Sequence, residues 1–249
     1  MAETIHLDND GPFDVYTATP PDGTPVKGGL VVIHEIWGLV DHIRDIADRF
    51  AAQGWIVAAP DILSRGGITP NLGAELSAIR AGNDDEAKNN AQTRMREASA
   101  PMHSPEFGAW AVASLRQVLD WLDEQPGAAG HLAVTGFCFG GTYSFALAAA
   151  DARITAAVPF YGSPPATAEL ANITAPVLAF YGDEDERLIT GLPDVTKGMT
   201  DAGVDFTPTV FEGTGHAFFN NTNPHAYNAA YADQAWNSTL AFLDEHTAG

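Results

Sequence analysis

Apolar runs and amphipathic segments alternate along the chain from one end to the other. The strand-like runs are short, as expected for a buried sheet, and cover Gly29–His34, Trp55–Ala59, Leu132–Thr135, Ile154–Tyr161, Ala175–Tyr181 and Phe206–Phe211. Helix-like segments lie between them: one after Asp41, one from Ser104 onward, Thr142–Ala150, residues 190–202 and a last one with Trp236, Leu240 and Leu243 on one face. This alternation predicts an α/β fold with helices on both faces of an open, mostly parallel sheet.

Two regions depart from this alternation. Asp14–Thr19 alternates with period two and, together with Thr4–Leu7, predicts an antiparallel ribbon at the start of the chain. Residues 61–104 are polar and interrupted by Gly and Pro, so we expect loops there with one or two short helices, and no separate domain. Long loops above a rigid sheet often carry substrate contacts. The length of the chain, residues 1–249, fits a single domain.

The chain is strongly acidic, with 32 Asp and Glu side chains against 12 Lys and Arg and a formal charge of −20. Such a surface repels nucleic acid and anionic lipid, so neither is expected as a partner. The acidity could also reflect a salt-rich habitat. No apolar run approaches the roughly 18 residues of a membrane span, and the first residues lack the pattern of a secretory signal, which predicts a cytoplasmic protein. The single cysteine excludes an intramolecular disulfide.

The most informative motif is Gly136-x-Cys138-x-Gly140, which lies between a predicted strand and a predicted helix. The glycines let the backbone make a sharp turn that exposes the central side chain, the pattern of a nucleophile elbow with cysteine in place of serine. Amide groups at the start of the following helix favour negative charge on that side chain. A lone cysteine is more often a small buried apolar residue, but this motif favours a nucleophile.

Polar residues after other predicted strands complete a possible catalytic site, because the carboxyl ends of parallel strands meet at one edge of a sheet. A thiol nucleophile needs a base, and the base needs a carboxylate to orient it. His216 follows the last predicted strand and is the candidate base. Asp185 is the candidate acid, with Asp183 as the alternative. The order Cys138, Asp185, His216 is the nucleophile, acid and histidine order of α/β-hydrolases.

Two backbone amides are candidate oxyanion donors: that of Phe139, directly after the nucleophile, and that of Ile36, in the loop after an early strand. The aromatic residues Trp37, Tyr161 and Phe218 fit either the core or the wall of a substrate pocket. The eight histidines show no HExxH or similar spacing, and the elbow is not a GxGxxG motif. Neither a metal nor a nucleotide cofactor is therefore expected.

Four motifs in order make the chain resemble the dienelactone hydrolase family of α/β-hydrolases over essentially its full length: His34–Leu39, Gly136–Gly141, Gly182–Asp185 and Gly215–Phe218. The resemblance implies the α/β-hydrolase fold and a Cys-His-Asp triad. It also implies a glutamate, here Glu35, that interacts with the resting thiol and helps form the thiolate when substrate binds. The implied reaction is hydrolysis of a lactone through an acyl-enzyme, without metal or organic cofactor.

One position departs from the family. Dienelactone hydrolases hold the substrate carboxylate with arginines, one of them four residues beyond the catalytic histidine, and that position here is Asn220. Arg80, Arg94 or Arg96 could supply a partial substitute. The expected substrate is thus a small lactone or ester of unspecified structure, and the expected assembly is a monomer or small homo-oligomer. Alternatives are a promiscuous carboxylesterase, an acyltransferase and a non-catalytic binding protein with a hydrolase fold.

Overall fold

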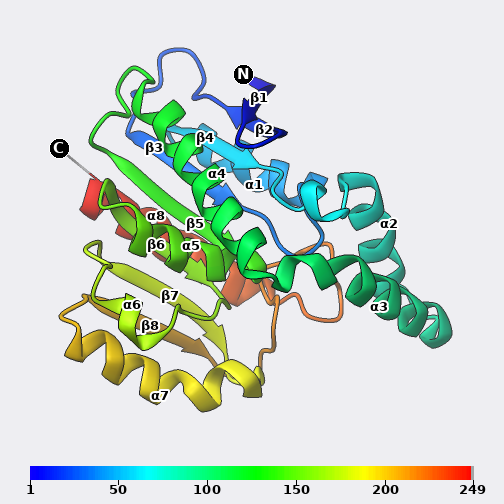
Figure 1. Ribbon diagram of the computed structural model, residues 1–249. Helices are drawn as coiled ribbons and strands as arrows, with labels where there is room; N and C mark the ends of the chain where they lie inside the picture. The colour runs from blue at the N-terminus through cyan, green and yellow to red at the C-terminus, as the bar shows by residue number, and fades with distance from the viewer. Residues whose placement is uncertain (248–249) are drawn as a thin grey trace.

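The computed structural model describes residues 1–247, and within them eight strands form one sheet in the order β1-β2-β4-β3-β5-β6-β7-β8 (Figure 1). The strands are β1 (Ala2–Asp8), β2 (Pro12–Ala18), β3 (Gly28–Ile33), β4 (Trp55–Pro60), β5 (Leu132–Phe137), β6 (Ile154–Phe160), β7 (Val177–Gly182) and β8 (Phe206–Phe211). Strands β3 to β8 run parallel, while β1 and β2 form the predicted antiparallel ribbon. The predicted α/β fold is confirmed.

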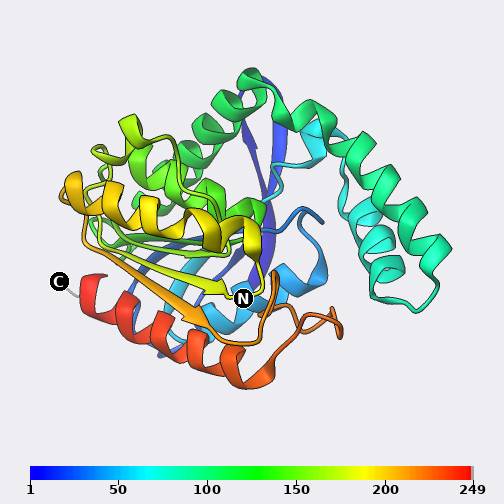
Figure 2. The same ribbon diagram turned by 90° about the horizontal axis from the view of Figure 1, so that it is seen from below.

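Helices cover both faces of this sheet, so that α1 and α8 lie on one face and α4, α5 and α7 on the other (Figure 2). The helices are α1 (Asp41–Ala52), α2 (Pro70–Ala81), α3 (Asp85–Ser99), α4 (Pro105–Asp123), α5 (Phe139–Ala150), α6 (Thr167–Leu170), α7 (Glu186–Asp201) and α8 (Ala229–Thr247). This double cover explains why β3, β5 and β7 are buried along their whole length and read as unbroken apolar runs. None of the helices in the described residues is long and apolar enough to cross a membrane.

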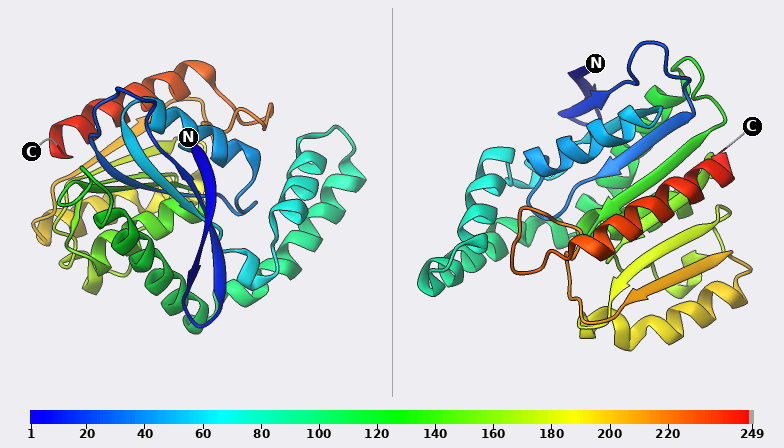
Figure 3. Two further views of the ribbon diagram at one scale, coloured as in Figure 1. Left: turned by 90° about the horizontal axis from the view of Figure 1, so that it is seen from above. Right: turned by 180° about the vertical axis from the view of Figure 1, so that it is seen from behind.

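The region 61–104 is more regular than its sequence suggests. It contains two full helices, α2 of 12 residues and α3 of 15 residues, which pack side by side and project away from the sheet (Figure 3). The side chain of Thr69 caps α2, and that of Asp84 caps α3. The expectation of loops with one or two short helices underestimated the length of these helices, because they bury few side chains. They therefore lack the apolar stripe by which a helix is detected.

Two other helices begin earlier than predicted. Helix α5 starts at Phe139 and not at Thr142, because Cys138 itself is the N-cap of the helix. Helix α7 starts at Glu186 and not near residue 190, directly after Asp185. Both candidate catalytic residues thus lie at a strand-to-helix junction, where the backbone of a rigid element fixes their positions.

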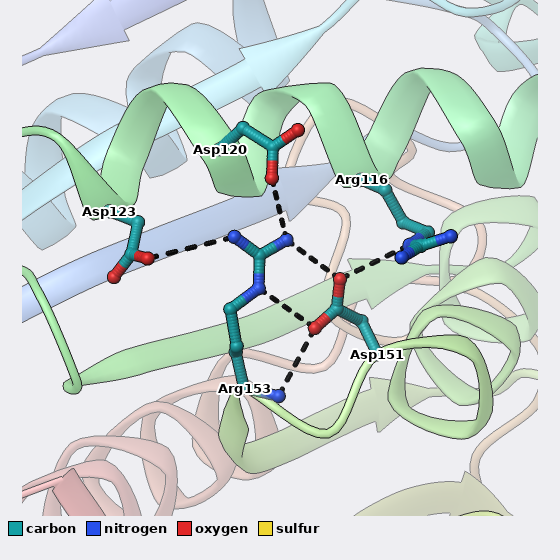
Figure 4. A network of polar contacts seen from close by, with 5 residues as sticks. All are labelled: Arg116, Asp120, Asp123, Asp151 and Arg153. Carbon is teal, nitrogen blue, oxygen red and sulfur yellow. Dashed lines mark hydrogen bonds and ion pairs between the residues drawn. The ribbon is translucent and has the colours of Figure 1, made fainter.

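An ion-pair network anchors the far end of α5 (Figure 4). The guanidinium of Arg153 donates to both carboxylate oxygens of Asp151, at 2.9 and 2.7 Å, and also lies 2.7 Å from Asp120 on α4. Arg116 donates to the same Asp151 carboxylate at 3.2 Å. These bonds, above all those from Arg153, hold the pKa of Asp151 at about 2. The network thereby ties α4 to the chain between α5 and β6, at the end of α5 opposite Cys138.

Candidate active site

Cys138 lies at the turn between β5 and α5 in a backbone conformation that side chains rarely adopt, with φ 57° and ψ −110°. Both glycines of the motif are needed for this turn. A Cβ atom on Gly136 would lie 2.3 Å from the carbonyl oxygen of Gly140, and one on Gly140 would lie 2.1 Å from that of Ile33. The close packing of these backbones makes the turn sharp and fixes the thiol at the carboxyl edge of the sheet.

The surroundings of the Cys138 thiol act on its charge in opposite directions. Burial and, second, the negative charge of Glu35 raise the pKa of the thiol to about 12. Hydrogen bonding from the backbone N–H groups of Phe139 and Ile36 opposes this shift, as does the guanidinium of Arg187. Both candidate oxyanion donors therefore lie near enough to the sulfur to favour negative charge on it. Because the raising effects win, the resting side chain is a neutral thiol that must lose its proton before it attacks.

Glu35 is buried just beyond β3, where two neutral groups donate hydrogen bonds to its carboxylate. The Tyr161 hydroxyl donates to Oε1 at 3.1 Å, and the side-chain amide of Asn220 donates to Oε2 at 2.5 Å. Burial raises the pKa of Glu35 to about 7, while these two hydrogen bonds oppose the shift. The carboxyl group can consequently gain or lose a proton near neutral pH.

His216 and Asp185 form a hydrogen-bonded pair, with 2.5 Å between Nδ1 of the imidazole and Oδ2 of the carboxylate. Only about 9% of the Asp185 side chain is exposed, against 36% for His216, so the imidazole is the accessible member. Asp183 has a different partner: its carboxylate accepts the backbone N–H groups of Gly213 and Thr214, at 2.7 and 3.3 Å. Of the two candidate acids, Asp185 is thus the one in contact with His216.

Cys138 and His216 line the same cavity, which has a volume of about 670 Å³. It lies at the carboxyl edge of the sheet, and residues of α2 and α3 form part of its wall. Its walls are formed by Glu35, Ile36, Trp37, Arg80, Asp85, Lys88, Asn89, Cys138, His216, Ala217, Asn223 and His225. A thiol, an imidazole oriented by a carboxylate, and the backbone of Ile36 therefore meet at one cavity, an arrangement suited to nucleophilic acyl chemistry.

The three aromatic residues considered as substrate contacts lie in different places. Trp37 lines the cavity, whereas Tyr161 and Phe218 are buried and do not line it. Tyr161 lies beneath the cavity, with its ring 5.0 Å from that of His216. Phe218 packs edge-on against Tyr161 in the core. The reason is the positive φ of 67° at Ala217, which turns the chain so that His216 faces the cavity while Phe218 points inward.

Several residues near the site could not be located from the sequence. Asn220, noted only as the place of an absent arginine, is buried against Glu35. Of the three arginines of the hairpin region, Arg80 reaches the cavity, whereas Arg94 pairs with Glu75 at 2.7 Å. Arg96 lines a second cavity of about 550 Å³, which adjoins the first and shares Trp37, Arg80 and Asn89 with it. The only signal in the sequence was the general tendency of long segments above a sheet to contact substrate.

Within residues 1–247, no group of three or more His, Cys, Asp or Glu side chains is arranged to hold a metal ion. The polar groups that line the cavity include the thiol of Cys138, the imidazole that Asp185 holds from behind and the carboxyl group of Glu35, an arrangement suited to attack on a carbonyl carbon.

Comparisons with known proteins relate the chain to carboxylic ester hydrolases. The sequence model of the dienelactone hydrolase family matches residues 13–247. "Protein usf" of Aquifex pyrophilus is 34% identical, covering 99% of this chain and 99% of its own. A "Putative carboxymethylenebutenolidase" of Saccharolobus solfataricus is 29% identical, covering 98% of each. The crystal structure titled "Putative Dienelactone Hydrolase" from Klebsiella pneumoniae superposes with a TM-score of 0.79 at 25% identity, covering 98% of both chains.

Proposed function

The chain belongs to the dienelactone hydrolase family of carboxylic ester hydrolases, and from this premise we propose that it cleaves a small lactone or ester through a covalent acyl-enzyme on Cys138. One observation carries the proposal: the thiol at the strained elbow opens into the same cavity as the His216–Asp185 pair. The family alone could not assign these roles, because a fold can persist after activity is lost.

In the first half of the proposed reaction, the sulfur of Cys138 attacks the carbonyl carbon. The S–C bond forms as the C=O π electrons move to oxygen, and the N–H groups of Phe139 and Ile36 stabilise the negative charge there. The thiol proton ends on His216, which passes it to the leaving oxygen as the C–O bond breaks. The product is a thioester, from which the alcohol departs or, in a lactone, stays tethered to the acyl group.

In the second half, water attacks the thioester carbon. His216 takes a proton from the water, the same two amides stabilise the second oxyanion, and the S–C bond breaks as the thiol regains its proton. Asp185 keeps the proton of the imidazole on Nδ1, so that the other ring nitrogen faces the cavity as a base, and it stabilises the imidazolium that forms. The net reaction consumes one water and yields an acid and an alcohol.

Glu35 is proposed to start the first half. At neutral pH the resting thiol holds its proton, whereas a carboxyl group with a pKa of about 7 is present in both protonation states. The carboxylate can therefore accept the thiol proton when substrate alters the surroundings of the sulfur, and pass it on to His216, which lines the same cavity and delivers it to the leaving oxygen. Tyr161 and Asn220 hold Glu35 in place for this transfer, and their hydrogen bonds lower its pKa by less than burial raises it.

Replacing Glu35 with glutamine is expected to change two measurements in opposite directions. Turnover of an activated ester should fall by about 10²-fold, the scale of one acid–base group. Alkylation of Cys138 by iodoacetamide should become faster, because loss of the nearby negative charge lowers the pKa of the thiol. The second effect should be largest above pH 7, where wild-type Glu35 is charged.

A suitable control for this pair of measurements is Glu184→Gln, which removes an exposed acidic group near the same edge of the sheet. It should leave both rates within about twofold of wild type, as surface changes usually do. If Glu35→Gln slowed both alkylation and turnover, the carboxylate would be activating the resting thiol and not raising its pKa.

The positively charged side chains of α2 and α3 indicate which class of substrate the cavity could bind. Arg80 and Lys88 are the Arg and Lys residues among those that line the catalytic cavity, and Lys88 is paired with Asp85 at 2.6 Å. Arg80 forms no ion pair within the described residues, although acidic residues greatly outnumber basic ones in this chain. We therefore assign to Arg80 the binding of a carboxylate on the substrate.

A panel of lactones and aryl esters, each with and without a carboxylate near the carbonyl, tests this assignment. We expect the carboxylate-bearing members to be preferred, and Arg80→Gln to raise their KM by about tenfold, the scale of one charge-assisted hydrogen bond. Arg94→Gln is the matched control, because Arg94 is already paired with Glu75. The alternative, an esterase for neutral substrates, is favoured by the neutral Asn220, and equal rates for both halves of the panel would support it.

A further inference from the structure

His34 contacts both segments that carry the proposed oxyanion donors, the loop after β3 and the start of α5. Its Nδ1 lies 2.8 Å from the carbonyl oxygen of Glu35. Since a carbonyl can only accept, Nδ1 carries the hydrogen and donates it. That carbonyl belongs to the same planar peptide unit as the N–H of Ile36. The same carbonyl also accepts the backbone N–H of Gly38 at 3.0 Å, so the hydrogen bond from His34 helps to fix the plane, and hence the direction, of one oxyanion donor.

The ring of the same histidine also contacts the residue that carries the other donor. It lies parallel to the ring of Phe139, at an angle of 8° and with 5.7 Å between the ring centroids. Tyr143 packs against Phe139 as well, at 4.5 Å. Phe139 is thus held between two rings at the first residue of α5, where the direction of its backbone N–H is set. One side chain, His34, contacts both donor-bearing segments.

His34 is fully buried, at a position where an apolar side chain would be expected. Its Nε2 makes no hydrogen bond to any group in residues 1–247, and burial lowers the pKa of the ring so that it stays neutral. A buried nitrogen without a partner costs free energy that an apolar side chain of similar size would not. The histidine is present at this position despite the free-energy cost of its unpaired Nε2, and the Nδ1 hydrogen bond is what an apolar residue could not supply. This indicates a role beyond filling space.

From this geometry we infer that His34 is a positioning residue of the oxyanion hole, which aligns the N–H groups of Ile36 and Phe139 for the transition state. The hydrogen bond to the Glu35 carbonyl also polarises the peptide, which strengthens its N–H as a donor when negative charge develops. The inference rests on the proposed function, because an oxyanion hole has a role only if Cys138 attacks a carbonyl group.

Two substitutions separate positioning from packing. His34→Phe keeps a flat ring against Phe139 but removes the donor to Glu35, whereas the side-chain nitrogen of His34→Asn can occupy nearly the place of Nδ1. We expect His34→Phe to lower kcat by about 10- to 100-fold, less than the loss of a whole oxyanion donor, with KM within about threefold of wild type. His34→Asn should retain kcat within about fivefold of wild type.

A small aliphatic aldehyde gives a second measurement that a purely structural role would not move. The thiol of Cys138 adds to its carbonyl group, so that an S–C bond forms and the oxygen gains the proton, giving a tetrahedral adduct in the oxyanion hole. Its Ki should rise in His34→Phe by about the factor that kcat/KM falls. Phe139→Leu, which keeps the backbone donor and removes the stacked ring, should lower kcat by at least about threefold with little change in KM.

The outcomes are distinct. Equal losses of kcat in His34→Phe and His34→Asn, or a loss confined to KM, would overturn the inference. If His34→Phe fails to fold, a wild-type kcat and an unchanged aldehyde Ki in Phe139→Leu would overturn it as well. Cys138→Ala separates this from the proposed function: full activity in Cys138→Ala would refute the proposed function, whereas a normal kcat in His34→Phe beside an inactive Cys138→Ala would refute only the role of His34.

Discussion

Replacing Cys138 with alanine is expected to lower kcat for an activated aryl ester or lactone by about 10⁴- to 10⁶-fold, the scale of losing a nucleophile from a catalytic triad. The reason is that the remaining groups cannot form the acyl-enzyme. The oxyanion donors and His216 could still assist direct attack by water, which accounts for a small residual rate. Initial rates under saturating substrate, compared with a no-enzyme blank, measure the loss.

The fold should survive this substitution, because alanine is smaller than cysteine and the turn is held by Gly136 and Gly140. A thermal unfolding midpoint within a few degrees of wild type would show that the loss is chemical. Retention of more than about one-tenth of the wild-type kcat would contradict the assignment of Cys138, since no partial nucleophile remains.

The second large effect is expected at Asp185. Asp185→Asn should lower kcat by about 10³- to 10⁴-fold, because an amide can donate to Nδ1 and so stabilise the wrong tautomer of His216. KM should change little, since Asp185 contacts the imidazole and does not line the cavity. Steady-state kinetics on one activated ester is sufficient to measure both constants.

Asp183→Asn provides the matched control for this prediction, two residues away in the same loop. The Asp183 carboxylate accepts hydrogen bonds from the backbone N–H groups of Gly213 and Thr214. None of its hydrogen bonds involves the imidazole of His216. Its replacement should lower the thermal midpoint while leaving kcat within about threefold of wild type. The assignment of the acid would be reversed if Asp183→Asn abolished turnover and Asp185→Asn did not.

Much of the fold and of the candidate site could be predicted from the sequence because a parallel sheet imposes its own geometry. Residues that follow different strands, such as Cys138 and His216, converge once the strands run the same way. The elbow can also be predicted from the sequence, because its backbone packs so closely that only glycine fits at these positions. The helices of 61–104 were not predicted, because few of their side chains face a core.

The directions in which individual side chains point could not be predicted from the sequence. The choice between Asp183 and Asp185 depends on which carboxylate points at His216, and the burial of Phe218 depends on the positive φ at Ala217. Asn220 shows the same limit. In the sequence it marks only the place of an absent arginine, whereas in the structure its side chain donates a hydrogen bond to Glu35. The two residues are 185 positions apart, so no local sequence pattern predicts the contact.

The most direct test of the account is to trap the acyl-enzyme. Wild-type protein mixed with an excess of an activated ester and quenched in acid within milliseconds should gain the mass of one acyl group, and peptide mapping should place it on Cys138. In His216→Ala the adduct should persist longer, because deacylation lacks its base. No adduct should form in Cys138→Ala. An acyl group on any other residue, or rapid turnover with no adduct at any quench time, would contradict the proposed mechanism.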